Sequence, residues 1–330
     1  MKTFLKVFIV SFLCFFIAFY IGGRAYIKDN NIALEEDMGF GFAENLSIPN
    51  KIFTKLETSP VEVEKYSSLQ EAYDKSSRKN FLILGMEDIR TDAIILASLC
   101  PNTKKVDVIS IPRDTYIHRK GYNTGEQRKI NSIYYVHGIE GVKKTVSHIL
   151  EDIPIHHYIM VEYEGVEKIV DMIGGVEVDV PFHMKYRDPT ATPPLNIDIP
   201  AGKQVLSGKD SLNFIRYRKG NNRMGYVDGD LGRIKTQHEF LKSFVSKSLD
   251  NILSVVTKGF SYVKTDVGML DALSYGRKVM GMESNDVNYI ILPGKSDLRK
   301  INRRVFSYFI HNDREIKKVL EEMYNVESTE

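Results

Sequence analysis

The sequence predicts an α/β domain in which a mixed central sheet is flanked by helices. Three short apolar runs, at residues 81–85, 93–99 and 106–111, have the length and composition of buried strands. Downstream of them, strand-like and helix-like segments alternate, which favours a sheet covered by helices. The chain has 330 residues, enough for one substantial domain with an anchor and a connecting stalk.

The individual elements are expected from local signals. The polar stretch 101–105 has turn residues, so the second and third runs are expected to form a hairpin. The apolar stripe of residues 163–173 predicts an amphipathic helix that ends at Gly174 and Gly175. Further expected elements are helices at 130–135 and 141–150, strands at 157–161 and 176–180, a long helix at 230–249, a strand at 289–292 and a helix at 313–324.

An uncharged apolar run at residues 7–22 lies near the N-terminus, with basic residues on both sides. Its length is close to the lower limit for a helix that spans a bilayer. A cleaved signal peptide and a retained anchor are both open, but a clear A-x-A-like cleavage site after Tyr20 is missing, which favours the anchor. We expect a cytoplasmic tip and transmembrane signal anchor at 1–26, an extracytoplasmic stalk at 27–79 and a catalytic domain at 80–330.

Composition excludes several classes of protein. The formal net charge is only +2, and a nucleic-acid binder would carry a larger excess of Lys and Arg. No P-loop, G-x-S-x-G or H-E-x-x-H motif is present in the sequence. The two cysteines, Cys14 and Cys100, form no C-x-x-C motif. An extracytoplasmic domain that uses no disulfide suits a Gram-positive-type bacterium.

Arginines and carboxylates gather where the expected strands end. Such loops are where α/β domains place ligands, and the planar guanidinium binds phosphate oxygens in a bidentate manner. Several Arg with a few carboxylates suit a pyrophosphate held with Mg²⁺, which takes one or two protein carboxylates. The candidates are Glu87, Asp88, Arg90 and Asp92 after the first strand, Arg113 and Asp114 after the third, and Arg216, Arg218, Arg233 and Gln237 downstream.

Each candidate also has a structural explanation when taken alone. Arg113-Asp114 has the form of an ordinary loop ion pair. Arg216 and Arg218 are expected to share one face of a solvated edge strand. Asp230 is a possible cap of the long helix, with Arg233 in its first turn.

Taken together, the segments between about residues 80 and 244 resemble the LytR-CpsA-Psr family of cell-wall glycopolymer ligases. The matching segments, in the order of the family, are LILGMEDIRTDAIILASL, TKKVDVISIPRDTYI, KIN, DMIGGVEVDV, LSGKDSLNFIRYRKG and GDLGRIKTQHEFLKSF. The resemblance implies an α/β fold that binds polyprenyl pyrophosphate, with the lipid in a hydrophobic tunnel between sheet and helices.

The resemblance also assigns residues. It places phosphate-binding groups at Arg90, Arg113, Lys129, Arg216, Arg218, Arg233 and Gln237, and magnesium carboxylates at Asp92 and at Glu87 or Asp88. The chain departs from the family at two points. It has Glu87-Asp88 where the family has one Asp after the Gly, and Thr236-Gln237-His238 where Arg-Gln-Gln is frequent.

The expected function is a Mg²⁺-dependent phosphotransferase at the cell membrane, acting outside the cytoplasm. It would move a teichoic-acid-like or capsular glycopolymer from polyprenyl pyrophosphate to peptidoglycan, with Arg113 stabilising charge and Asp92 or Asp114 deprotonating the acceptor hydroxyl. Two alternatives remain open: a polyprenyl-pyrophosphate phosphatase, and a non-enzymatic lipid-binding regulator of the envelope or of transcription. No nucleic-acid partner is expected.

Overall fold

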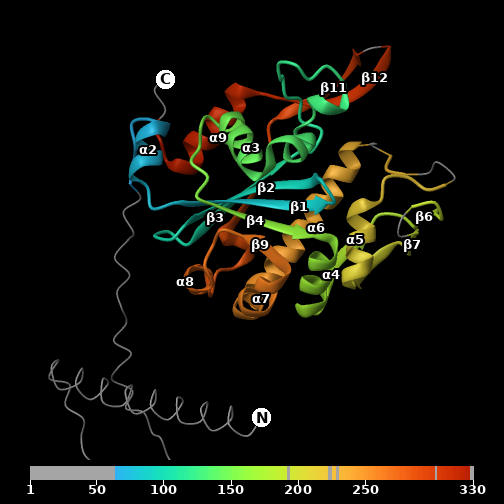
Figure 1. Ribbon diagram of the computed structural model, residues 1–330. Helices are drawn as coiled ribbons and strands as arrows, with labels where there is room; N and C mark the ends of the chain where they lie inside the picture. Colours follow the sequence, from blue (N-terminus) through green and yellow to red (C-terminus); the bar gives the residue numbers. More distant parts are fainter. Residues whose placement is uncertain (1–63, 192–193, 222–224, 228–229, 302, 328–330) are drawn as a thin grey trace, which may run out of the picture. The chain divides into compact units, whose positions relative to one another are not determined.

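The computed structural model describes residues 64–191, 194–221, 225–227, 230–301 and 303–327. Its centre is a six-stranded sheet of order β10-β3-β2-β1-β4-β9, with helices on both faces (Figure 1). The strands are β1 (Lys79–Glu87), β2 (Arg90–Cys100), β3 (Lys105–Ile111), β4 (His157–Glu162), β9 (Val263–Thr265) and β10 (Val287–Ile291).

The sheet is mixed, as the sequence predicts. β1 is parallel to β4, and β3 is parallel to β10. β1–β2, β2–β3 and β4–β9 are antiparallel, and β2–β3 is the expected hairpin. Three two-stranded sheets lie outside it: β5 (Val176–Val180) with β8 (Gly202–Leu206), β6 (Met184–Asp188) with β7 (Leu195–Ile199), and β11 (Gly294–Ile301) with β12 (Arg304–His311).

The expected helices form, and several further ones accompany them. The expected pair at 130–135 and 141–150 corresponds to a 3-10 turn, Ile130–Ser132, that leads into α3 (Ile133–Ile149), which breaks at Gly138 with φ 59°. The others are α2 (Leu69–Lys75), α4 (Tyr163–Met172), α5 (Gly208–Arg216), α6 (Asp230–Asp250), α7 (Ile252–Gly259), α8 (Met269–Val279) and α9 (Asp313–Tyr324), with short 3-10 helices at Glu126–Arg128, Phe260–Tyr262 and Ser284–Asp286.

The two glycines after α4 end that helix as expected. Gly174 and Gly175 have φ of 83° and 88°, a conformation that a side chain disfavours. The Gly175 amide donates to the carbonyl of Val170, which satisfies the last turn of the helix. The chain then turns directly into β5.

One face of the sheet carries the main core. Leu82 and Leu84 of β1 and Leu96 of β2 are fully buried there, together with side chains from α3 and α9. Figure 1 shows α3 and α9 above the sheet. A second core joins α4, α5, α6 and strands β5 to β8, and a smaller one joins β2, β3 and β10 to α6.

The folded domain begins before residue 80, the start that the sequence predicts. Tyr66 and Ala72 belong to the main core, and Tyr66 forms a β-bridge with Val326. Ser68 caps α2 through its side chain, which accepts from the Glu71 amide. Residues 64–79 therefore pack on the domain instead of extending the stalk. The sequence does not reveal this, because the short segment buries only a few apolar side chains and shows little periodicity. Residues 1–63, with the expected anchor, lie outside the described residues.

The opposite face of the sheet is less covered. Phe81 and Ile83 of β1 alternate with fully buried residues yet remain partly exposed, as do Ile95 of β2 and Ile159 of β4, which lie beside Ile83 in register. We call the strip formed by these residues, with Gly85, Ala93 and Ala97, the apolar sheet face. Over six residues of a strand it is about 20 Å long.

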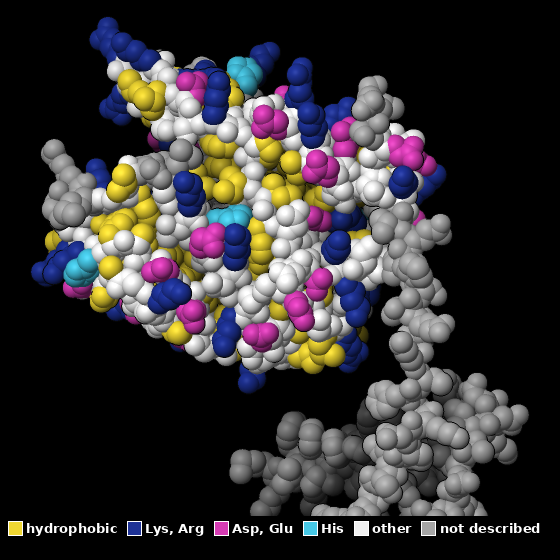
Figure 2. Space-filling model, turned by 180° about the vertical axis from the view of Figure 1, so that it is seen from behind, with side chains coloured by type: hydrophobic (Ala, Val, Ile, Leu, Met, Phe, Trp, Pro, Cys, Tyr) yellow, Lys and Arg dark blue, Asp and Glu magenta, His cyan; other side chains and the backbone are white. Residues whose placement is uncertain are grey.

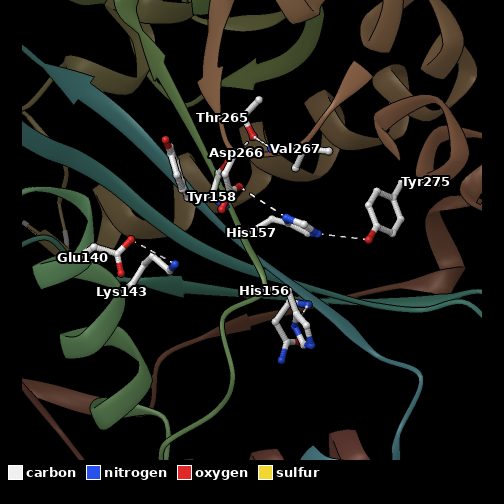
Figure 3. Close-up of polar contacts among 10 residues, drawn as sticks. Glu140, Lys143, His156, His157, Tyr158, Thr265, Asp266, Val267 and Tyr275 are labelled. Carbon is white, nitrogen blue, oxygen red and sulfur yellow. Dashed lines mark hydrogen bonds and ion pairs between the residues drawn. The ribbon is translucent and has the colours of Figure 1, made fainter. Parts of the chain in front are cut away.

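An aromatic cluster lies at the end of the apolar sheet face where β4 begins. The Phe81 ring stacks on His157 at a centroid distance of 5.4 Å and meets Tyr275 of α8 edge-on at 5.1 Å. His157 lies between Asp266 and Tyr275, with Nδ1 3.6 Å from the carboxylate and Nε2 3.3 Å from the hydroxyl (Figure 3). These contacts attach α8 to the sheet at that end.

From residue 64 onward, the described helices include none that is both long and apolar enough to cross a membrane.

Candidate active site

A bulge places one carboxylate at the end of the β1–β2 hairpin. Gly85 pairs with Ala93 and Met86 with Thr91, so Asp92 is an extra residue on β2 without a partner on β1. A bulge of this kind redirects a side chain relative to a regular strand. Residues 90–92, which the sequence places in a loop, are therefore part of β2, and only Asp88 and Ile89 form the turn.

Asp92 is held on both oxygens. Oδ1 accepts from Arg113 Nη1 at 2.5 Å, and Oδ2 accepts from the Tyr163 hydroxyl at 2.8 Å. Arg113 follows β3 and Tyr163 opens α4, so residues from three parts of the chain meet here. Arg113 Nε is buried and makes no hydrogen bond to another described residue, which leaves it able to donate to a ligand.

Glu87 extends the same cluster. Its Oε1 accepts from Arg216 Nη2 at 3.0 Å, and the Arg216 guanidinium lies 4.5 Å from the centre of the Tyr163 ring. Tyr163 thus contacts both Asp92 and Arg216. Two arginines, two carboxylates and one phenol form a continuous network at the carboxyl end of β1.

The two carboxyl groups titrate in opposite directions. Burial, together with the proximity of Asp92, raises the pKa of Glu87 against the opposing charge of Arg216. Burial also acts to raise the pKa of Asp92, but the Arg113 charge and hydrogen bonds from Glu87, Tyr163 and Arg113 lower it on balance. Glu87 is therefore the group of the pair that holds a proton more readily, and Asp92 is the one that stays charged.

Asp114 and Lys129 lie next to this network. Lys129 Nζ is 3.2 Å from Asp114 Oδ1 and 3.5 Å from Glu126. The neighbouring Asn131 amide donates to the Arg113 carbonyl at 3.2 Å, which fixes the loop that carries Arg113. The KIN segment, residues 129–131, thus holds the backbone of Arg113 in place.

The remaining expected residues are distributed around the cluster. Arg90 is exposed and pairs with Glu87 across the hairpin, so the two side chains share a face. Gln237 lies in α6, and its side-chain amide donates to the Ile215 carbonyl at 2.7 Å, which secures the end of α5 beside Arg216. Arg233 lies one turn earlier on α6 and is half-buried.

One expectation about geometry is wrong, and one open choice is narrowed. Arg216 and Arg218 do not alternate on a strand, because Arg216 is the last residue of α5 and the buried Tyr217 is its C-cap. Arg218 follows as an exposed residue. Asp88 is exposed in the hairpin turn with φ 55°, so Glu87 is the carboxylate that lies beside Asp92.

Sequence reasoning missed Tyr163. It was assigned only to the start of an amphipathic helix, yet it follows β4, whose Glu162 pairs with Met86 in parallel register. A residue directly after a strand parallel to β1 emerges at the same edge as Glu87. That position was the available signal.

The carboxylates of the site do not form a complete metal-binding site by themselves. Across the described residues, no cluster of three or more His, Cys, Asp or Glu side chains could hold a metal ion. Glu87 and Asp92 instead form a pair, which is the number of protein carboxylates that Mg²⁺ commonly takes beside phosphates and water. Because Arg113 and Arg216 flank this pair, the site is built for a ligand with several anionic oxygens.

Comparison with known proteins identifies a family and several relatives. The model of the LytR_cpsA_psr family matches residues 50–325. The chain belongs to this family. Members among its relatives include the polyisoprenyl-teichoic acid–peptidoglycan teichoic acid transferase TagU of Oceanobacillus iheyensis, 30% identical over 277 residues, with 79% of each chain covered.

A second relative of the family is TagV of Bacillus subtilis, which has the same transferase description. It is 28% identical over 261 residues, covering 70% of this chain and 65%, slightly less than two thirds, of that protein. The crystal structure of Bacillus subtilis TagV superimposes with a TM-score of 0.61 at 25% identity, over 77% of this chain and 100% of that one. The LytR_cpsA_psr fold, a mixed sheet flanked by helices, is thereby confirmed.

Proposed function

We propose that this protein is a phosphotransferase that moves a teichoic-acid-like glycopolymer from a polyprenyl pyrophosphate carrier to peptidoglycan. The observation that supports this most is the convergence of Arg113 and Arg216 on the Glu87–Asp92 pair, at one end of the apolar sheet face. A pyrophosphate needs the arginines, and a polyprenyl tail needs an uncovered apolar strip beside them. The descriptions of TagU and TagV as transferases agree with this reading.

The apolar sheet face supports the expected lipid tunnel. Its side chains are partly exposed, whereas the alternate side chains of the same strands are fully buried on the other face. Leaving apolar surface uncovered costs about 25 cal/mol per Å² unless a partner covers it. A polyprenyl chain running from the site toward the Phe81–His157–Tyr275 cluster would supply that cover.

Mg²⁺ is the cofactor that fits the carboxylate pair. When bound, it would neutralise charge on the pyrophosphate oxygens. Glu87 and Asp92 would hold it, and Glu87, whose pKa is raised by burial and by Asp92, would have to release its proton for both carboxylates to bind. We expect Glu87→Gln to raise the Mg²⁺ concentration for half-maximal activity at least about tenfold. An unchanged Mg²⁺ dependence would argue against this pair as the metal site.

The transfer itself requires charge stabilisation and one base. The acceptor hydroxyl oxygen forms a bond to the phosphorus that carries the glycopolymer, the bond from that phosphorus to the bridging oxygen breaks, and polyprenyl phosphate leaves with the electron pair. Arg113 and Arg216 stabilise the charge that develops there. The lowered pKa of Asp92 makes it a weak base, and Asp114 is the other carboxylate beside Arg113 that could take the hydroxyl proton.

The test uses a polyprenyl-pyrophosphate-linked glycopolymer and peptidoglycan with the membrane-bound protein. Wild type should attach polymer, and Arg113→Ala should reduce attachment at least about a hundredfold, because it removes a charge that contacts the transferred group. Arg187→Ala, an exposed arginine of β6, is the matched control. Release of polymer into water at the same rate without peptidoglycan would indicate a phosphatase, and normal attachment by Arg113→Ala would refute the proposal.

We also propose that the protein is a single-pass membrane protein with the domain outside the cytoplasm. The uncharged run at residues 7–22 supports this. Protease digestion of the domain on intact cells tests it, since a domain protected until lysis would lie on the other side.

A further inference from the structure

The β11–β12 hairpin projects from the molecule and is strongly basic. Figure 1 shows it extending from the top of the domain, and Figure 2 shows Lys and Arg side chains at the corresponding tip. Each strand has eight residues, so the hairpin is about 27 Å long. Its basic residues are Lys295, Arg299, Lys300, Arg303 and Arg304, and its single carboxylate is Asp297. The hairpin therefore has a formal charge of +4, whereas the whole chain has a formal charge of +2.

The base of the hairpin is fastened to the loop that carries Arg113. The Phe309 amide donates to the Asp114 carbonyl at 3.0 Å, and the Tyr116 amide donates to the Phe309 carbonyl at 2.9 Å. The buried Tyr308 hydroxyl donates to the Gly125 carbonyl at 2.9 Å. The base of the hairpin is therefore fixed to the loop that carries Arg113.

Only one face of the hairpin is covered. Phe306 lies so close to Gly125 that a Cβ there would meet its ring at 2.4 Å, and Arg299 lies over Tyr116 at 4.5 Å. On the other face, Leu298 is 72% and Val305 64% exposed, and Lys300 lies between them in register with Val305. Lys300 is the cation of this apolar face, and the exposed Arg303 and Arg304 follow it at the tip of the hairpin.

We propose that this hairpin, the basic arm, binds the polyanionic chain of the glycopolymer as it leaves the site. The inference rests on the proposed function. A chain with regularly repeated phosphate groups is complementary to cations spaced along a strand. Phe309 and Leu292, at the base of the arm, belong to the main core, so the arm starts on the sheet face opposite the apolar sheet face. Lipid and polymer would thus leave the site on opposite sides, which favours the polymer over the membrane surface as the partner of the arm.

A binding experiment tests the arm without relying on catalysis. The probe is carrier-free poly(glycerol phosphate) teichoic acid, with the full-length protein in nanodiscs of neutral phosphatidylcholine. We expect Lys300→Gln/Arg303→Gln/Arg304→Gln to weaken binding about tenfold or more, and wild-type binding to weaken with added salt. The matched control removes three exposed cations elsewhere, Lys258→Gln/Lys264→Gln/Arg277→Gln, and should bind as wild type.

A kinetic experiment separates the arm from the site. With a long polymer donor the triple variant of the arm should show a raised KM and an unchanged kcat, whereas a donor with only a disaccharide should react as with wild type. Equal kinetics on the long donor, or loss of binding only to anionic phosphatidylglycerol vesicles, would overturn the proposed arm while the function stands. Failure of wild type on both donors would instead refute the function, and the binding experiment would still decide about the arm.

Discussion

At the scale of single residues, Tyr163 connects the carboxylate pair to the arginines and helps to keep Asp92 ionised. Its hydroxyl donates to Asp92 at 2.8 Å, and its ring supports the Arg216 guanidinium. A hydrogen bond to a charged group contributes about 1.5–3 kcal/mol, part of which appears as a lowered pKa of the acceptor. The phenol therefore acts together with the Arg113 charge to lower the pKa of Asp92, whereas burial raises the pKa of Glu87.

Tyr163→Phe should change the pH dependence of transfer. The substitution keeps the ring under Arg216 and removes a hydrogen-bond donor that lowers the pKa of both Asp92 and Glu87, so both carboxyl groups are protonated at a higher pH. We expect the acidic limb of the rate profile to move upward by about 1 pH unit, with a smaller effect at neutral pH. Rates over a pH series measure it.

The exposed Tyr135 on α3 supplies the control for that profile. Tyr135→Phe should give the wild-type limb. A limb that moves toward lower pH in Tyr163→Phe, or stays where it is, would show that the phenol does not tune Asp92.

At the scale of secondary-structure elements, the two faces of β1 differ in burial. Leu82 and Leu84 alternate into the main core, and Ile83 and Gly85 line the apolar sheet face. The sequence did not predict this difference. The apolar run at 81–85 contains no polar residue, and such a run is typical of a strand that is buried on both faces. Which face of β1 stays partly exposed depends on where the helices pack, and the structure shows this.

Ala93→Phe should block the apolar sheet face without disturbing the core. Ala93 is exposed and its Cβ lies near Gly85, so a ring there would occupy the space next to the pyrophosphate site. We expect at least about a tenfold rise in KM for a polyprenyl-linked donor, with an unchanged melting temperature. Donor titrations measure the rise.

Val136→Phe adds the same ring at an exposed position of α3, on the other side of the sheet, and should leave KM unchanged. If Ala93→Phe bound donor normally, the lipid would have to lie elsewhere.

At the scale of the whole molecule, one buried ion pair joins distant segments. Arg78 Nη1 contacts Asp107 Oδ2 at 2.7 Å, and Nη2 donates to the Met323 carbonyl at 2.5 Å. Asn288 donates to the other oxygen of Asp107 at 3.0 Å. Residues before β1, in β3, in β10 and in α9 are thus fixed to one another on the face of the sheet that α9 covers.

Arg78→Met should lower the free energy of unfolding by about 3–5 kcal/mol, because it leaves the Asp107 charge buried without a partner. Both side chains are only 10% exposed, so solvent screens the pair little. Urea unfolding followed by circular dichroism gives the change.

Lys65→Met breaks an exposed pair with Glu327, 3.9 Å apart, and should change stability by less than about 1 kcal/mol. Arg78→Met/Asp107→Leu should be more stable than Arg78→Met alone. A double variant as unstable as the single one would mean that lost packing, and not the unpaired charge, carries the cost.

The sequence alone was sufficient for the elements that depend on local pattern. Periodicity and glycine signals predicted β5, α4 and α9 nearly to the residue, because their apolar spacing reports directly which side is buried. The sequence also singled out Arg113, Arg216, Glu87 and Asp92, which the structure brings together, while their role in binding phosphate stays a prediction. The β11–β12 hairpin was missed because β11 is largely exposed and carries charges instead of an alternating apolar pattern.

Only the tertiary structure decided which of these residues meet. A bulge, unreadable from sequence, isolates Asp92 on β2, and the end of a helix, not a strand, presents Arg216 to Glu87. Tyr163 joins both because parallel pairing of β4 with β1 brings residues 71 positions apart into contact. Local sequence determines each element, but register and crossover place side chains across the sheet, and these depend on the packing of the whole chain.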